Sequence, residues 1–339
     1  MRLARNADGP ASPSWRQAGP TALLLALAAC NGPGSALVEA GRDAQRLAQL
    51  WWWMAGGAAL VWTAVVALAV YAVRAPPGRH GRRQADLLIL WGGAVFPTVV
   101  LAVLLVIGLR MMPVLAEPGA ADGIRLEVSG EQWWWRVRYH LPGEPPFETA
   151  NEVVLPVGER VEVTVTSPDV IHSLWVPSLA GKIDMIPGRV NRIALEPLRV
   201  GVYRGVCAEY CGASHALMAF EVVVVAEDEF RAWARAQAAP AAAPAGALAA
   251  RGAGAFLANG CGACHAVRGT LADGVVGPDL THVGSRRTLA AGTIPNDEDA
   301  FLRWIARPDS VKPGALMPSF GMLPADELRA LAAWLDGLR

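Results

Sequence analysis

The chain has 339 residues, of which 53% are hydrophobic and 18% are charged. This apolar composition excludes an intrinsically disordered chain, and the length favours two or three folded units. The net charge is zero, so it gives no reason to expect a nucleic-acid partner. The charge is uneven: residues 1–116 carry 10 basic and 4 acidic side chains, residues 117–235 carry 11 and 17, and residues 249–339 carry 9 of each. We therefore expect three parts in different environments.

The first 29 residues have the pattern of a lipoprotein-type signal peptide. Arginines precede a short apolar run over 21–29, and the segment Leu27-Ala-Ala-Cys30 resembles a bacterial lipobox. The run is too short to cross a hydrocarbon core, which needs about 20 residues. We expect residues 1–29 to be removed and Cys30 to be lipidated. A buried helix with a core cysteine is the alternative.

Two longer uncharged runs predict transmembrane helices over 50–73 and 87–109, within a segment 30–116. Both exceed the length that a membrane span requires. The loop between them carries four arginines, and the positive-inside rule therefore places that loop in the cytoplasm. Both outer ends of this hairpin then face outside. Pro97, inside the second run, predicts a kink there.

Residues 117–235 change to a strand pattern. Apolar and polar residues alternate over 124–128 and 161–165, and 220–225 is a β-branched run. Alternation with period two, punctuated by glycine and proline, is typical of strands. Several short strands favour an all-β sandwich or barrel, here outside the membrane.

A group of metal-binding residue types lies near the end of this region. Cys207, Cys211, His215 and Met218 follow the spacing C-x3-C-x3-H-x2-M, with His172 a further 35 residues upstream. Such soft donors select copper or zinc over hard cations, and the thioether favours copper. Two thiolates can bridge two copper ions. The alternative, a disulfide between the two cysteines, is allowed outside the cytoplasm but leaves the histidine and the methionine unexplained.

The remainder predicts a linker and a haem-binding domain. Residues 236–248 are an Ala/Pro stretch, typical of a semi-extended linker. Residues 249–339 contain Cys261-Gly-Ala-Cys264-His265, the attachment signature of c-type haem. In that signature two thioethers hold the porphyrin and the histidine binds the iron. The alternatives are a zinc half-site and a redox C-x-x-C pair. No second cysteine pair follows, which disfavours zinc.

The sixth iron ligand is expected downstream of this signature. Met317 follows a Pro/Gly-rich loop and precedes an amphipathic helix over 325–338. A methionine ligand raises the potential of haem, as in cytochromes c. Met322 and His282 are the alternatives. The order of these motifs resembles class I cytochrome c.

Residues 50–235 resemble subunit II of the haem–copper oxidases. The resemblance rests on four segments: 132–135, 169–178, 182–189 and the metal-binding box 207–218. It implies a cupredoxin-like domain that holds the dinuclear copper centre CuA. The implied CuA ligands are His172 with Met218 on one side, His215 with the backbone carbonyl of Glu209 on the other, and Cys207 with Cys211 as bridges.

The same resemblance implies two further roles. Trp133 is the aromatic residue through which electrons enter, and the Glu209 side chain binds magnesium, or manganese, at the interface with subunit I. Two departures stand out. Glu131 occupies a position where the family often has histidine, and 87–109 lacks the glutamate that many members use for proton entry, for which Asp86 is a candidate substitute.

The whole chain resembles subunit II of a caa3-type cytochrome c oxidase: two transmembrane helices, an all-β cupredoxin-like domain and an all-α class I cytochrome c domain. This implies an electron-entry subunit that passes electrons through haem c and CuA to an oxygen-reducing subunit I with haem and CuB. Further implied partners are subunit III, membrane lipid, and a cytochrome c or a cytochrome c-reducing complex as donor. The implied location is the bacterial cytoplasmic membrane, with both redox domains on the periplasmic face. The alternatives are the corresponding subunit of a nitric oxide reductase and a stand-alone membrane-anchored carrier.

Overall fold

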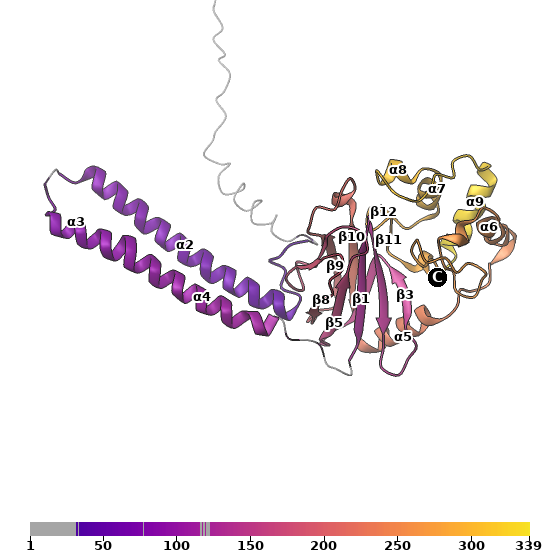
Figure 1. The fold of residues 1–339 in the computed structure, drawn as a ribbon, viewed down its shortest axis with the longest axis horizontal. Helices are drawn as coiled ribbons and strands as arrows, with labels where there is room; N and C mark the ends of the chain where they lie inside the picture. The colour runs from indigo at the N-terminus through magenta and orange to yellow at the C-terminus, as the bar shows by residue number, and fades with distance from the viewer. Residues whose placement is uncertain (1–31, 33, 77, 116, 118, 120–122) are drawn as a thin grey trace, which may run out of the picture.

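The computed structural model describes residues 32, 34–76, 78–115, 117, 119 and 123–339. Along the chain it forms a long helical hairpin, a β-sandwich and a helical domain (Figure 1). The hairpin projects from one end of the sandwich, and the helical domain lies against the other side (Figure 1).

The hairpin consists of α2 (Arg42–Arg74) and a second helix made of α3 (Arg82–Leu88), the π-helical segment η1 (Ile89–Val95) and α4 (Phe96–Leu115). Both arms are long and apolar enough to cross a membrane. Their large apolar side chains are exposed, as Trp53 at 82% and Val73 at 87% show. Exposed apolar surface on this scale is unfavourable in water and favourable in lipid.

The second arm is irregular just before Pro97. We predicted a kink at this proline, and the structure has a π-helical segment, η1, that ends two residues earlier at Val95. Proline has no backbone N–H and cannot continue the regular hydrogen-bond ladder, and a π segment is one way in which a helix absorbs such a disturbance.

The start of α2 is attached to the sandwich. The amide of Arg42 donates to the carbonyl of Glu196 at 3.0 Å, and that of Ala44 to the carbonyl of Leu179 at 3.2 Å. A Cβ on Gly41 would lie 2.3 Å from the Leu179 carbonyl oxygen, so this close approach requires glycine. The first turns of α2 therefore belong to the outer domain.

The sandwich has two five-stranded sheets, in the orders β3-β2-β1-β5-β8 and β4-β10-β9-β6-β7. The strands are β1 (Arg125–Glu131), β2 (Trp134–His140), β3 (Phe147–Ala150), β4 (Glu152–Pro156), β5 (Val161–Thr166), β6 (His172–Trp175), β7 (Ile183–Met185), β8 (Asn191–Leu195), β9 (Gly201–Cys207) and β10 (Ala219–Val225). The β1–β5 and β4–β10 pairs are parallel, and the other pairs are antiparallel.

Alternating side chains of both sheets fill the core between them. Leu126 and Val128 of β1 point inward and are buried, as the sequence pattern predicted. Trp135 of β2 is fully buried and contacts Phe220 of β10 in the opposite sheet, with ring centroids 4.9 Å apart. The helix α5 (Glu227–Ala238) adds Phe230 to this core.

The helical domain has a core of its own. Its elements are α6 (Gly246–Ala258), η3 (Cys261–Ala263), η4 (Val283–Ser285), the short pair β11 (Thr288–Leu289) and β12 (Ile294–Pro295), α7 (Glu298–Ala306), α8 (Pro308–Val311) and α9 (Ala325–Asp336). The helices α5 and α6 take up both ends of the expected linker 236–248, so only 239–245 connects them. This segment lies against the helical domain, because the Ala241 amide donates to the Arg268 carbonyl at 2.8 Å.

Candidate metal and haem centres

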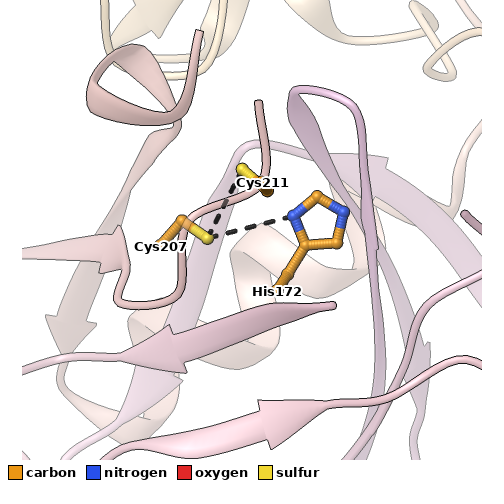
Figure 2. Close-up of side chains that lie close together, drawn as sticks. All are labelled: His172, Cys207 and Cys211. Atoms are coloured by element: carbon orange, nitrogen blue, oxygen red, sulfur yellow. Dashed lines mark hydrogen bonds between the residues drawn. The ribbon is translucent and has the colours of Figure 1, made fainter. Parts of the chain in front are cut away.

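Three ligand candidates meet at one end of the sandwich. His172 begins β6 and Cys207 ends β9, and these strands are neighbours, so the fold brings the two residues together (Figure 2). The Cys207 Sγ atom lies 3.9 Å from His172 Nδ1 and 3.8 Å from Cys211 Sγ. All three side chains are buried. The sulfur separation exceeds the ~2.05 Å of a disulfide, so both cysteines are free thiols here.

The short helix η2 (His215–Leu217) brings two more donors to the same place. The Cys211 Sγ atom lies 3.6 Å from His215 Nδ1 and 3.8 Å from Met218 Sδ. The backbone carbonyl of Glu209 points at the cluster, because it accepts a hydrogen bond from the Cys207 thiol at 3.1 Å. Every donor that the family resemblance implied for the copper site therefore lies around the sulfur pair.

The shifted pKa values of the Cys207 and Cys211 thiols suit the binding of a soft cation. The hydrogen bond between the two sulfurs lowers the pKa of Cys207 and raises that of Cys211. The pair therefore loses its first proton easily and its second mainly in exchange for a metal ion. Two thiolates, two imidazoles and a thioether in a buried cluster fit copper.

Asp169 orients His172. Its Oδ1 lies 2.8 Å from His172 Nε2, which leaves Nδ1 facing Cys207. A carboxylate on the outer nitrogen fixes the tautomer and the ring orientation of a metal-binding histidine. The other carboxylate oxygen accepts the backbone N–H of Gln132 at 2.7 Å. Asp169 begins the segment 169–178 that carries the family resemblance, but no sequence pattern indicated a role for its side chain.

Trp133 lies directly on the cluster. Its indole Nε1–H donates to the Cys211 carbonyl at 2.9 Å, and the Gln132 side chain donates to the same carbonyl at 2.7 Å. The side chain is buried, with 8% of its surface exposed. A Cβ on Gly212 would lie 3.0 Å from the indole, so glycine allows this close contact.

The Glu209 side chain lies at the protein surface. It is 46% exposed, and its nearest charged partner is Lys182, at 3.9 Å. Lys182 also pairs with Asp184 at 2.8 Å. This group of three charges lies on the protein surface.

The haem-attachment residues lie in the helical domain. Cys261 and Cys264 are free thiols in and next to η3. The Nδ1 atom of His265 lies 2.8 Å from the Pro278 carbonyl and donates to it, which leaves Nε2 available to a metal. Burial lowers the pKa of His265, so the ring is neutral near pH 7. A Cβ on Gly277 would lie 2.5 Å from this ring, so only glycine fits.

The three candidates for the sixth iron ligand differ in their surroundings. Met317 is half-buried and packs against the core of the helical domain, whereas Met322 is 77% exposed. His282 is buried, and its Nε2 lies 3.0 Å from the Ala239 carbonyl. These surroundings favour Met317. The residues present fit a c-type haem, with two thiols, an oriented neutral histidine and a thioether.

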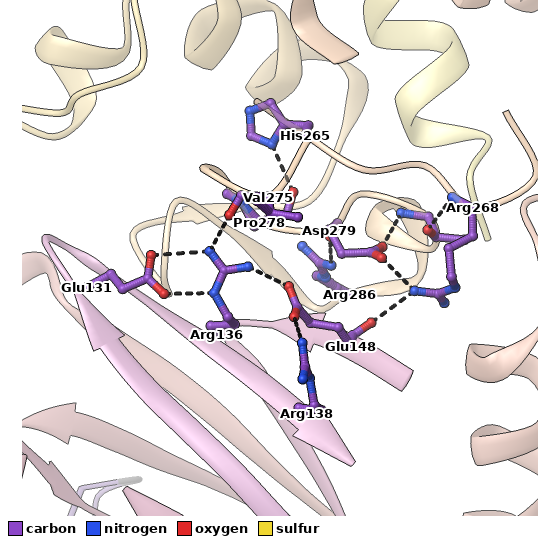
Figure 3. A network of polar contacts seen from close by, with 11 residues as sticks. Glu131, Arg136, Arg138, Glu148, His265, Arg268, Val275, Pro278, Asp279 and Arg286 are labelled. Carbon is purple, nitrogen blue, oxygen red and sulfur yellow. Dashed lines mark hydrogen bonds and ion pairs between the residues drawn. The ribbon is translucent and has the colours of Figure 1, made fainter. Parts of the chain in front are cut away.

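A chain of polar contacts joins the sandwich to the loop that supports His265 (Figure 3). Arg136 on β2 pairs with Glu131 at 2.7 Å and Glu148 at 2.7 Å, and donates to the Val275 carbonyl at 2.8 Å. From the other side, Arg268 donates to the Glu148 carbonyl at 3.1 Å. Glu131, the departure from the family pattern, thus pairs with the arginine that contacts the haem domain.

The comparisons with known proteins agree with this geometry. Residues 143–226 match the family "Cytochrome C oxidase subunit II, periplasmic domain", and residues 249–339 match the family "Cytochrome c". Cytochrome c oxidase subunit 2 of Alkalihalophilus pseudofirmus is 36% identical over 269 residues, which cover 78% of this chain and 76% of that protein. The chain belongs to the cytochrome c oxidase subunit 2 family.

The chain is also similar to a second full-length relative and to a solved periplasmic domain. Cytochrome c oxidase subunit 2 of Bacillus sp. (strain PS3) is 30% identical over 268 residues, 74% of each protein. The crystal structure of the periplasmic domain of subunit II from Bradyrhizobium japonicum has 32% sequence identity and a TM-score of 0.33, and covers 35% of this chain and 96% of that one.

The family assignment confirms the predicted fold class and activity. This subunit II of a cytochrome c oxidase carries a fused cytochrome c domain, the arrangement of the caa3 type. It associates with subunit I of the oxidase, is anchored by two apolar helices, and has an outer-facing copper-type domain. The predicted signal peptide 1–29 and the lipidation site Cys30 lie outside the described residues.

Proposed function

We propose that this subunit is the electron entry of the oxidase and that electrons pass from haem c to dinuclear CuA and then to subunit I. When bound, each centre accepts and releases electrons one at a time. The single observation that carries this order is the position of Trp133. Its indole lies close to Gly314 of the haem domain, where an added Cβ would come within 3.0 Å of the ring, and donates to the Cys211 carbonyl of the copper cluster at 2.9 Å.

The residues of the copper domain would hold two ions. Cys207 and Cys211 would bridge them, with His172, His215, Met218 and the Glu209 carbonyl completing the set. Asp169 keeps His172 in the ligating tautomer, and the buried sandwich keeps the geometry rigid. A rigid site lowers the reorganisation that accompanies each change of charge.

In the haem domain, Cys261 and Cys264 would form the thioethers, and His265 and Met317 would bind iron. The exposed Glu209 side chain would bind magnesium at the contact with subunit I, since carboxylates and this hard cation match. The setting would be a bacterial cytoplasmic membrane, with subunit III in the complex and a cytochrome c or a cytochrome c-reducing complex as donor.

Stopped-flow reduction of the purified oxidase tests the order. The haem should be reduced first, and the copper should follow at a rate that does not depend on protein concentration, because both centres share one chain. The haem is followed by its visible bands and the copper by thiolate charge-transfer absorption. Metal analysis should find two coppers per chain from this subunit. Reduction of copper before haem would contradict the proposal.

A further inference from the structure

Lys312 of the haem domain is buried against the copper domain. Its Nζ donates to the Trp133 carbonyl at 2.6 Å and to the Ala290 carbonyl at 2.9 Å. Only 3% of its surface is exposed. The contact with Trp133 joins residues 179 positions apart, across the boundary between the two domains.

The two residues that follow Lys312 also lie on the copper domain. The Pro313 carbonyl accepts the hydroxyl of Ser214 at 2.7 Å, and Ser214 is fully buried next to His215. Gly314 has φ +79°, and a Cβ there would lie 3.0 Å from the ring of Trp133. Residues 312–314, the clamp segment, thus cover the outer side of the indole, whose inner side faces the copper cluster.

Further contacts hold the same two domains together. Arg287 pairs with Glu221 at 2.7 Å, and the Ala219 amide donates to the Ala291 carbonyl at 3.0 Å. The Arg287 side chain is 53% exposed, and exposed ion pairs contribute little to stability. The haem domain therefore brings cations to the acidic copper domain, and the buried contacts of Lys312 are the stronger ones.

Loss of the Lys312 amine would leave the Trp133 carbonyl without this donor inside an interface. The Ala290 carbonyl would still accept the Thr293 hydroxyl at 2.7 Å. An unsatisfied buried carbonyl is costly. Burial lowers the pKa of Lys312 to about 7, but a neutral amine still has two N–H groups, enough for both carbonyls. The clamp therefore keeps its hydrogen bonds on both sides of neutral pH.

We propose that Lys312 anchors the haem domain on Trp133, so that the chain's own cytochrome domain occupies the electron-entry face of the copper site and excludes external cytochromes from it. This rests on the proposed function. The transfer that the anchor supports moves one electron from ferrous iron to the oxidised copper pair and neither makes nor breaks a bond. Lys312 is a positioning residue, since it contacts the backbone of Trp133 and neither metal.

The test compares Lys312→Met with Arg251→Met in the complete oxidase. Both variants replace a long basic side chain of the haem domain with methionine, but Arg251 is exposed and pairs with Asp326 of the same domain. The amide of Ala219 reports docking, because it donates across the interface. Its protection against hydrogen exchange should fall about tenfold in Lys312→Met, a change expected from one unsatisfied buried group, and should not change in Arg251→Met.

Two kinetic measurements accompany the exchange experiment. In Lys312→Met the haem-to-copper transfer should slow severalfold, and a basic soluble cytochrome at low salt should reduce copper directly, which it should not do in the wild type. Gly314→Ala is an independent second variant, since its Cβ would push on the indole. Gly246→Ala is its control, because Gly246 has φ +85° and an added Cβ would meet nothing within 4 Å.

The outcomes separate this inference from the proposed function. If Lys312→Met and Arg251→Met had the same exchange rate at the Ala219 amide and the same haem-to-copper transfer rate, the proposal that Lys312 anchors the haem domain would be overturned. The same result for Gly314→Ala and Gly246→Ala would overturn it too. Reduced protection with unchanged transfer would also overturn it, because docking would then not govern the electron path. Copper reduced before haem in the wild type would instead refute the proposed function itself.

Discussion

Asp169 connects the copper ligand His172 to the segment that carries Trp133, and replacing it tests both connections. Its Oδ1 accepts His172 Nε2 at 2.8 Å and the Val170 amide at 2.6 Å, while Oδ2 accepts the Gln132 amide at 2.7 Å. Asp169→Ala removes every one of these acceptors. Asp169→Asn keeps one oxygen, so it can satisfy only one side of the carboxylate at a time.

The magnitude follows from these contacts. A hydrogen bond to a charged group contributes about 1.5–3 kcal/mol, and loss of an outer partner of a ligating histidine lowers metal affinity about 10–100-fold. We therefore expect copper affinity to fall about 10–100-fold in Asp169→Ala. In Asp169→Asn the remaining oxygen should stay at the Oδ1 position, because His172, Val170 and the Ser167 hydroxyl all donate there. The hydrogen bond to the Gln132 amide should then be lost. That variant should retain copper more tightly than Asp169→Ala but transfer electrons more slowly than the wild type.

The assay is retention of copper by the purified oxidase at rising chelator concentration, measured by metal analysis and by the electron paramagnetic resonance signal of the mixed-valence pair. Glu127→Ala is the control, since it removes an exposed carboxylate from the same domain. If Asp169→Ala and Glu127→Ala lost copper at the same chelator concentration, the role given to Asp169 would be wrong.

Two further changes have clear expected results. Gly252→Ala should destabilise the haem domain by about 1–3 kcal/mol, because its Cβ would lie 2.0 Å from the Ala330 carbonyl oxygen of α9. Gly254→Ala should stabilise the domain by up to about 1 kcal/mol, because a Cβ there meets nothing within 4 Å. Calorimetry should show shifts of opposite sign, at about 4–8 °C per kcal/mol, and shifts of the same sign would contradict the packing argument. Mass spectrometry of the mature chain should find a lipidated Cys30 at its N-terminus, and an intact Met1 terminus would exclude this.

Local patterns in the sequence predicted the strands and the metal-binding box. The alternation over 124–128 and 161–165 corresponds to β1 (Arg125–Glu131) and β5 (Val161–Thr166), because burial on one face of a sheet imposes a period of two. The residues from Cys207 to Met218 are close in sequence, so their spacing alone indicated a common site. His172 was named with them as a soft donor, but it lies 35 residues upstream of Cys207. Its place at the site depends on the pairing of β6 with β9, which is not visible in a local pattern.

Contacts between the domains could not be predicted in this way. Lys312 looks like an ordinary loop lysine, and its burial depends on Trp133, 179 residues away. Hydrophobic periodicity describes how one element packs on its own core, and it carries no information on which polar side chains meet between two folded domains. The helices α5 and α6 likewise run into the stretch 236–248 that the sequence suggested as a linker, since they end at Ala238 and begin at Gly246.

The attachment of α2 to Leu179 and Glu196 has a mechanical consequence. An α-helix rises 1.5 Å per residue and resists bending, and α2 continues unbroken from these contacts into the apolar span. Ala208, in the loop between the two cysteines, lines the same surface hollow as Leu47 of α2. A bilayer of different thickness changes the tilt of a span. Because the start of α2 is hydrogen-bonded to the sandwich, a change of tilt would rotate the copper-binding domain together with the helix.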